Sequence, residues 1–198
     1  FFWGIQSSNT GANGKPETTT DGIVPLIKTY GTTSDYSLDT SYSGKTWLDG
    51  GADWLDEQLE VIFRYGSQER LGFAGSGAIL GIQKLVKELG FYTVNVQTTS
   101  FGMKVLEWVT PFGSLYLKTH PLFSYEATTR NSVVLIEPKN IKYRFIQDTM
   151  FKADNTDKQG GGTGKDGKEE EYLTECGLEM HYPLTCGYLN GFNTDSAV

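Results

Sequence analysis

The spacing of apolar residues changes from helical to alternating about halfway along this 198-residue sequence. Between residues 51 and 65 the apolar side chains recur at i, i+4, i+7 and i+8, at Leu55, Leu59, Ile62 and Phe63. Such spacing places them on one face of a helix. We therefore predict a helix here, with Gly66 as its C-terminal cap.

A second helix is predicted after a short buried strand at residues 70–74. Ser76 is suited to the N-cap position of this helix, and Gly90 to its C-terminal end. Between these two residues the apolar positions again follow a helical period: Ile79, Ile82, Leu85, Val86 and Leu89.

From residue 91 onward the apolar period is two, which indicates strands. The clearest alternation places five side chains on one face of a late strand: Tyr172, Thr174, Cys176, Leu178 and Met180. Residues 110–113 are a typical hairpin connection. Strands are predicted at residues 92–96, 104–109, 114–118, 131–136, 141–145, 150–153 and 172–180. Two helices on a mostly antiparallel sheet define an α+β fold.

Three segments rich in Ser, Thr, Asn, Asp and Gly are predicted to be loops: residues 7–22, 31–46 and 154–168. The third contains five glycines and is predicted to be flexible. Residues 23–30 are apolar but interrupted by Pro25, so they predict either a strand or an irregular turn.

The charge pattern argues against nucleic acid and membrane as binding partners. Seventeen basic residues face 24 acidic ones, for a net charge of −7, and no basic stripe is visible. Lys139, Lys142 and Arg144 are interpreted as the solvated edge of a strand, with phosphate contact as the alternative. No apolar run approaches the roughly 18 residues that a membrane span needs, and no signal peptide is visible.

The sequence predicts no metal site. Cys176 and Cys186 are the only cysteines, and they are interpreted as reduced, half-buried core thiols in an intracellular assembly environment. A disulfide between them is the alternative. With His181 they form a Cys-x₄-His-x₄-Cys arrangement, and His120 is distant; neither matches the paired spacing of zinc sites.

No cofactor site or catalytic constellation is predicted either. Gly75, Gly77 and Gly81 open a helix with GxGxxxG spacing, one residue longer than the dinucleotide fingerprint, and are interpreted as a tight strand-to-helix turn. Residues 160–166 lack the first glycine and the Ser or Thr of a phosphate-binding loop. The acidic residues of the first helix are interpreted as a solvated face with favourable dipole placement: Asp49, Asp53, Asp56, Glu57 and Glu60.

Three segments resemble the major capsid proteins of tailed bacteriophages with the Hong Kong 97-type fold. Residues 70–90 (RLGFAGSGAILGIQKLVKELG) look like the strand and helix of that fold's axial domain. Residues 132–152 (SVVLIEPKNIKYRFIQDTMFK) resemble its crossover into the peripheral domain. Residues 171–192 (EYLTECGLEMHYPLTCGYLNGF) look like its final peripheral strand, and residues 1–4 like the tail of its spine helix.

The resemblance implies a domain division and a missing N-terminal part. Residues 1–22 would be the end of the spine-helix region with a connecting loop, 23–138 an axial-domain-like core, and 139–198 peripheral-domain-like strands. An N-terminal arm, an extended loop and most of the spine helix would be expected before Phe1. The lysine and asparagine of the isopeptide cross-link found in some relatives have no match here.

The function that the resemblance implies is structural, without enzymatic activity. The subunit would self-assemble into pentamers and hexamers of an icosahedral shell that contacts packaged DNA only by enclosing it. Portal, scaffold or decoration proteins would be further partners, with assembly in the host cytoplasm and residence in the virion. A cellular nanocompartment shell is an alternative within the same fold.

A second class is a secreted or virion-borne carbohydrate-binding or adhesive β-rich module, suggested by Trp47, Trp54 and Trp108. Because Trp54 adjoins an apolar helix face and Trp108 lies in a predicted strand, core packing is the preferred interpretation of these two residues. A hydrolase is the third class. It finds no support in the motifs, since the sequence has no GxSxG elbow.

Overall fold

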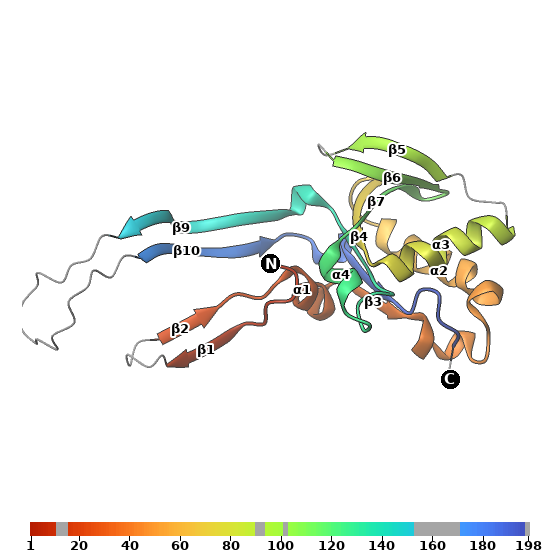
Figure 1. Cartoon of the computed structure of the whole chain (residues 1–198), viewed down its shortest axis with the longest axis horizontal. Coiled ribbons are helices and arrows are strands. Elements are labelled where there is room, and N and C mark those ends of the chain that lie inside the picture. The colour runs from red at the N-terminus through yellow and green to blue at the C-terminus, as the bar shows by residue number, and fades with distance from the viewer. Residues whose placement is uncertain (11–15, 90–93, 101–102, 153–170, 197–198) are drawn as a thin grey trace, which may run out of the picture.

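The computed structural model describes residues 1–10, 16–89, 94–100, 103–152 and 171–196. A body made of one sheet and its helices carries two β-hairpins, which project from it in the same general direction (Figure 1). The α+β class predicted from the sequence is confirmed.

The body contains a seven-stranded sheet of order β3-β11-β8-β4-β7-β6-β5. Two strand pairs are parallel, β3 with β11 and β4 with β7, and the other four are antiparallel. The sheet is therefore mostly antiparallel, as predicted. Its strands are β3 (Thr32–Asp35), β4 (Glu69–Ala74), β5 (Val94–Ser100), β6 (Met103–Thr110), β7 (Gly113–Thr119), β8 (Val133–Ile136) and β11 (Gly187–Asn190).

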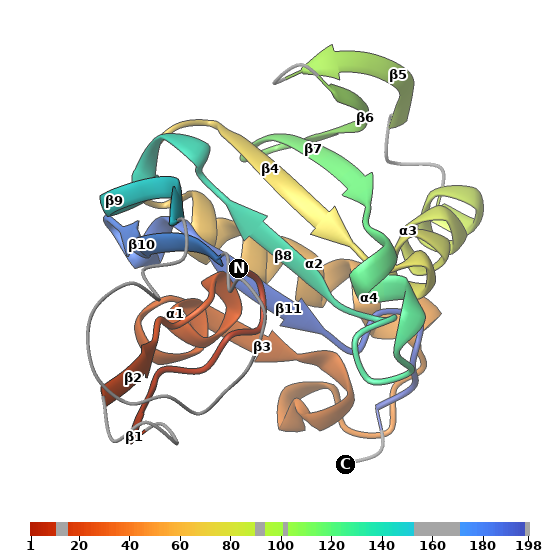
Figure 2. The ribbon, with the colours of Figure 1, turned by 60° about the vertical axis from the view of Figure 1, so that its left-hand side comes forward.

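Helices cover both faces of this sheet. They are α1 (Ile23–Tyr30), α2 (Trp47–Phe63), α3 (Ser76–Leu89) and the short α4 (Pro121–Tyr125), with 3₁₀ turns at Tyr36–Leu38, Thr40–Tyr42, Pro138–Asn140 and Pro183–Thr185. In Figure 2, α2 lies behind the sheet and α1 in front of it. Strand β8 shows why both faces need cover, since all four of its residues are buried.

The two faces of the sheet form two separate cores. Val133 and Leu135 of β8 join the core beneath α2 and α3, which also holds Trp54 and Trp108. Val134 and Ile136 join the other core, beneath α1 and α4. The alternation of side chains along one short strand thus connects both layers.

The helix and hairpin predictions are largely confirmed. Leu55, Leu59 and Ile62 are buried along α2, and residues 110–113 form the turn between β6 and β7. Helix α2 begins at Trp47, four residues before the predicted start. Helix α3 begins at Ser76 itself, so this serine is not the N-cap. Gly90 lies outside the described residues.

The loop predictions at residues 7–22 and 31–46 are wrong in part. Ser7–Thr10 (β1) and Pro16–Thr19 (β2) form an antiparallel hairpin, and Thr32–Asp35 is an edge strand of the central sheet. These strands are polar on both sides, so no hydrophobic alternation marks them. Threonine nevertheless favours extended backbone. The hairpin is also tied at its base, where Gln6 N donates to Asp21 Oδ1 at 2.7 Å.

The prediction of a strand or turn at residues 23–30 is also wrong, because this segment is helix α1. Pro25 occupies the first helical turn, where a missing N–H costs no hydrogen bond. Ile23, Val24 and Ile27 then share one buried face.

The predicted resemblance of residues 1–4 to a helix end is wrong as well. These residues are not helical, and they lie against the start of α1. Ile23 N donates to the Phe1 carbonyl at 2.8 Å, and Val24 N to the Phe2 carbonyl at 3.0 Å.

The second projecting hairpin joins β9 (Ile141–Lys152) and β10 (Glu171–Met180), which form a two-stranded sheet of their own. Strand β9 runs unbroken through the two strands predicted at 141–145 and 150–153. The chain then returns to the body, where β11 pairs with β8 and β3. The predicted flexible loop at 154–168 lies outside the described residues. In the part of the chain that the structure describes, no helix has the length and apolarity of a membrane span.

Candidate functional site

The β9–β10 hairpin, which we call the arm, presents one face rich in aromatic residues. Antiparallel partners share a face of the sheet, and β10 pairs its alternate residues with apolar residues of β9. The apolar arm face consists of Ile141, Tyr143, Phe145 and Phe151 from β9 and Tyr172, Cys176, Leu178 and Met180 from β10. The alternation predicted for residues 172–180 is thereby confirmed in its apolar members.

The outer part of this face is open to solvent. Phe145 is 56% exposed, Phe151 49% and Tyr172 76%. The rings of Phe151 and Tyr172 lie 5.5 Å apart across the two strands. Large apolar side chains gathered on one exposed surface indicate a contact surface.

The inner part of the same face is covered by the chain itself. Leu178 and Met180 pack against the core beneath α1, and the Phe1 ring lies 6.2 Å from the Tyr143 ring in an edge-on arrangement. The arm is thus anchored at its base, and its outer aromatic side chains are exposed among the described residues.

The opposite face of the arm is charged near the base. Arg144 of β9 forms an ion pair with Glu179 of β10, and Glu179 also pairs with His181. The hydrogen bond from Arg144, helped by His181, holds the pKa of Glu179 below its usual value. Ile146 and Met150, farther out on β9, are exposed apolar residues outside the apolar arm face, so the two faces differ in polarity mainly near the base.

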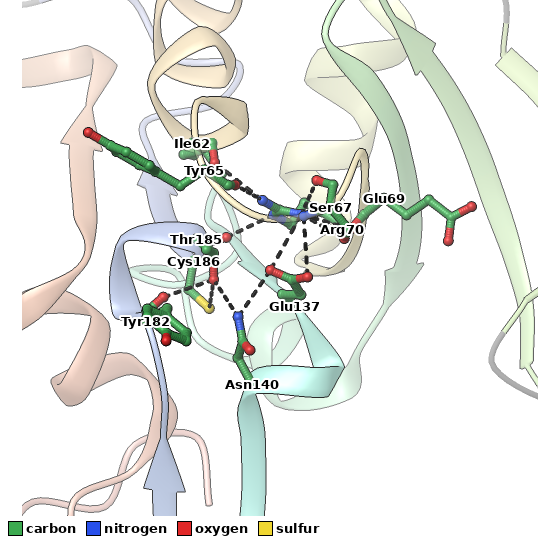
Figure 3. A network of polar contacts seen from close by, with 10 residues as sticks. All are labelled: Ile62, Tyr65, Ser67, Glu69, Arg70, Glu137, Asn140, Tyr182, Thr185 and Cys186. Carbon is green, nitrogen blue, oxygen red and sulfur yellow. Dashed lines mark hydrogen bonds and ion pairs between the residues drawn. The ribbon is translucent and has the colours of Figure 1, made fainter.

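The base of the arm adjoins a buried polar network centred on Arg70, which is fully buried in β4 (Figure 3). Its guanidinium donates to the Thr185 carbonyl at 2.8 Å and to the Glu69 carbonyl at 3.0 Å. It also donates to carbonyls at the C-terminal end of α2, those of Ile62 and Tyr65. A cation at that end of a helix is favourably placed.

Glu137 supplies the negative charge of this network. Its Oε2 lies 3.8 Å from Arg70 Nη1, and its Oε1 accepts a hydrogen bond from Ser67 N at 3.3 Å. Burial lowers the pKa of Arg70 from its usual value, and the charge of Glu137 opposes that shift. Because the usual value is far above neutrality, Arg70 remains a cation at physiological pH.

A hollow of about 640 Å³ opens beside the network. Its apolar rim includes Tyr65, Tyr182 and Leu184, which are all more than half exposed. Glu137, Asn140 and Thr185 line its polar side.

The candidate metal ligands do not come together. His120 caps the five-residue helix α4, where its Nδ1 accepts from Leu122 N at 3.2 Å, and His181 lies at the base of the arm. Within the described ranges no group of three or more His, Cys, Asp or Glu side chains is arranged to hold a metal ion. Both cysteines are free.

The interpretation of both thiols as half-buried is wrong. Cys176 is exposed on the arm because it lies beyond the covered base, whereas Cys186 is fully buried before β11. Burial raises the pKa of the Cys186 thiol.

Gly75 and Asp49 lie where the sequence predicted. Gly75 forms the strand-to-helix turn between β4 and α3, as predicted, and its N–H donates to the Ser132 carbonyl at 3.0 Å. A Cβ at Gly75 would lie 2.1 Å from the Arg130 carbonyl oxygen, so close backbone approach explains this glycine. Asp49 lies in the first turn of α2, as expected for a favourable dipole contact. Residues 160–166 lie outside the described residues.

The three tryptophans that suggested a carbohydrate-binding surface are buried. Trp47 is 3% exposed, Trp54 0% and Trp108 2%. Core packing is therefore confirmed for Trp54 and Trp108, and the same holds for Trp47. None of the three presents a ring to a ligand.

Sequence reasoning missed the Arg70 network. Arg70 begins an otherwise apolar strand segment, RLGFA. A charged residue at the start of a buried strand was the feature from which a buried ion pair could have been predicted. Its partner Glu137 follows the buried run VVLI in the same way. Nothing in the spacing of these two residues indicates that they meet, because β4 and β8 become neighbours only through the sheet order.

Comparison with known proteins shows similarity to phage major capsid proteins. A family model described as SU10 major capsid protein matches residues 1–193. The chain is also similar to a major capsid protein of Pseudomonas phage PaMx41, with 25% identity over 192 residues, which cover 90% of this chain and 45% of that protein. The chain thus spans less than half the length of this curated relative.

Proposed function

The chain belongs to the SU10 major capsid protein family, and from this premise we propose that it is a structural subunit of an icosahedral phage shell. Copies of it would form pentamers and hexamers that enclose double-stranded DNA. The observation that carries the proposal is the match of residues 1–193 to the family model. A net charge of −7 suits a container that releases its DNA.

The Hong Kong 97-type fold is the architecture we propose for this subunit. Its support is the order of elements: β4 and α3 lie within residues 69–89, β8 leads into the arm, and β10 returns the chain to the body. Residues 23–138 would be the axial-like domain and 139–198 the peripheral-like one, preceded by residues 1–22. Strand β11, near the C-terminus, lies in the central sheet, so the second region would contribute one strand to the first.

The apolar arm face is the surface we propose for contact between subunits. A two-stranded sheet gains little stability by itself in water, and this one exposes Phe145, Phe151 and Tyr172. Burial of such a ring against a neighbour contributes about 2 kcal/mol. A repeated subunit makes this contact many times in a closed shell.

Other partners and the location follow from the same premise. Portal, scaffold and decoration proteins would meet the assembled shell rather than the single chain. Assembly would take place in the host cytoplasm, and the finished protein would reside in the virion. The proposed role is contact between subunits and involves no enzymatic step.

Electron microscopy of the protein, expressed alone and with its viral partners, tests the proposal. Shells or ring-shaped capsomers are expected. A monodisperse monomer under both conditions would contradict it.

A paired substitution tests the arm face. Phe145→Ser with Phe151→Ser should leave the far-ultraviolet circular dichroism unchanged and weaken association by more than tenfold, since two buried rings are lost at each contact. Lys142→Ser with Glu175→Ser alters two exposed residues elsewhere on the same hairpin and is the matched control. Equal loss of assembly in both double variants would rule out a special role for the aromatic face.

A further inference from the structure

The arm joins the body at only two places along the described chain, after Asn140 and after Met180. Strand β9 has 12 residues and therefore extends about 40 Å. A small rotation at the base would displace the outer end of the arm by a much larger distance. The contacts at these two junctions, together with the packing of Leu178 and Met180 against the core beneath α1, set the direction of the whole arm.

Asn140 links both junctions. Its side-chain Nδ2 donates to Glu137 Oε2 and to Thr185 Oγ1, each at 3.1 Å. Its carbonyl accepts from His181 N at 2.7 Å. One residue thus connects the outgoing strand, the returning strand and the turn that follows. Figure 3 shows the two side-chain bonds, to Glu137 and Thr185.

The returning strand ends in a strained turn at Tyr182. This residue has φ 47° and ψ 62°, in the left-handed region that bulky side chains rarely adopt. The following Pro183 favours extended backbone at the preceding position. Thr185 holds the turn in place, because its N–H and its hydroxyl both donate to the Tyr182 carbonyl at 2.9 Å.

The fixed support of these bonds is Arg70. Its guanidinium is fully buried and donates to the Thr185 carbonyl, while Glu137 lies beside it. On the other side of Tyr182 and Thr185 is the open hollow at the arm base. The hydrogen bonds of Asn140 and Thr185 are therefore held in place on the side of the body and face open space on their outer side.

We infer that Asn140, Thr185 and the strained Tyr182 form a latch that holds the arm in one direction, and that opening it lets the arm swing without unfolding the body. The strain at Tyr182 favours release, and the hydrogen bonds of Asn140 and Thr185 oppose it. Opening would be an exchange between two arrangements of a short hinge.

The latch has a consequence for assembly that rests on the proposed function. Subunits in pentamers and hexamers have differently placed neighbours. An arm that takes two directions could contact the neighbour in both arrangements. The latch itself is tested on the unassembled chain, so its failure and the failure of the capsid proposal are separate results.

Spin-label distance measurements test the latch. The exposed Cys176 lies on the arm, and Lys87→Cys introduces an exposed label site on α3. Two labels per chain would show that Cys186 stays buried. The parent chain should give one narrow distance distribution, and Asn140→Ala or Thr185→Val should broaden or shift it while circular dichroism is unchanged. Lys139→Ala, an exposed neighbour of Asn140, is the control and should match the parent.

A second variant decides the outcome if those substitutions unfold the chain. Tyr182→Gly removes the strain and keeps the side chains of Asn140 and Thr185, so it should keep the distribution narrow and make the latched form more stable. Distributions of folded Asn140→Ala and Thr185→Val that equal the parent's would overturn the latch. So would a broader distribution in folded Tyr182→Gly, because then the strain would be holding the arm rather than favouring its release.

Discussion

Arg70 is a fully buried cation, and its surroundings show how the fold accommodates it. Removing a guanidinium from water is costly unless its donors and its charge are satisfied. Here backbone carbonyls from α2, β4 and the turn before β11 accept its hydrogen bonds, and Glu137 lies within ion-pair distance. The residue therefore ties three parts of the body together at the base of the arm.

Arg70→Met should lower the free energy of unfolding by about 3–5 kcal/mol, because it leaves the Glu137 carboxylate buried and without its cation. Urea denaturation followed by circular dichroism would measure the loss. Arg64→Met is the matched control, since Arg64 pairs with Glu60 on the exposed side of α2 and such pairs contribute less than about 1 kcal/mol. Similar losses in both variants would contradict the account of the network.

At the scale of elements, Gly50 and Gly51 show why a boundary was misplaced. The apolar period predicted a helix over residues 51–65, yet α2 begins at Trp47 and includes both glycines, although glycine is a poor helix former. The reason is packing. A Cβ at Gly51 would lie 2.7 Å from the Trp47 ring, and one at Gly50 would lie 2.7 Å from the Tyr36 hydroxyl oxygen.

Gly51→Ala should therefore destabilise the protein by about 1–3 kcal/mol, although alanine is the better helix former by about 1 kcal/mol. Thermal unfolding followed by circular dichroism would show a lower midpoint. Ala52→Gly in the same turn should cost only the propensity difference, about 1 kcal/mol. A stabilised Gly51→Ala variant would show that the Trp47 ring can move aside without cost.

The elements that could be predicted from the sequence are those that bury one face. Helices α2 and α3 and the β6–β7 hairpin have strong apolar periods, because each buries one face. The β1–β2 hairpin buries neither face, so its polar residues resemble a loop. Helix α1 was missed because Pro25 looks like a helix breaker anywhere except in the first turn.

The candidate site depends on contacts that sequence spacing does not encode. The contribution of β10 to the apolar arm face could be predicted from the alternation at residues 172–180, although the pairing of β10 with β9 shifts register around Glu175. The latch could not, because Asn140 and Thr185 are 45 positions apart and meet only when β10 returns beside β9. Tyr182 likewise gives no sign in the sequence of its left-handed backbone.

Over the whole molecule, buried tyrosines make the fold sensitive to alkaline pH. Tyr36 and Tyr42 lie in the core beneath α2, and Tyr188 lies in the core on the other side of the sheet. Burial raises the pKa of each phenol above the usual value of 10. For Tyr42 the shift is large, and a hydrogen bond with Glu57 adds to it. The phenol of Tyr36 also donates to the Thr46 carbonyl at 2.7 Å, which requires its proton.

Stability should consequently be complete below about pH 10 and fall as the pH rises through the raised folded values, because the unfolded chain loses its phenolic protons first. Each buried phenol would lower the free energy of unfolding by up to about 1.4 kcal/mol per pH unit. Tyrosinate absorbance should rise together with the loss of circular dichroism. Tyr188→Phe should move the alkaline midpoint upward, whereas Tyr125→Phe, which changes a phenol that is 92% exposed, should not. Ionisation of all tyrosines well before the circular dichroism changes would show that the two cores admit hydroxide without unfolding.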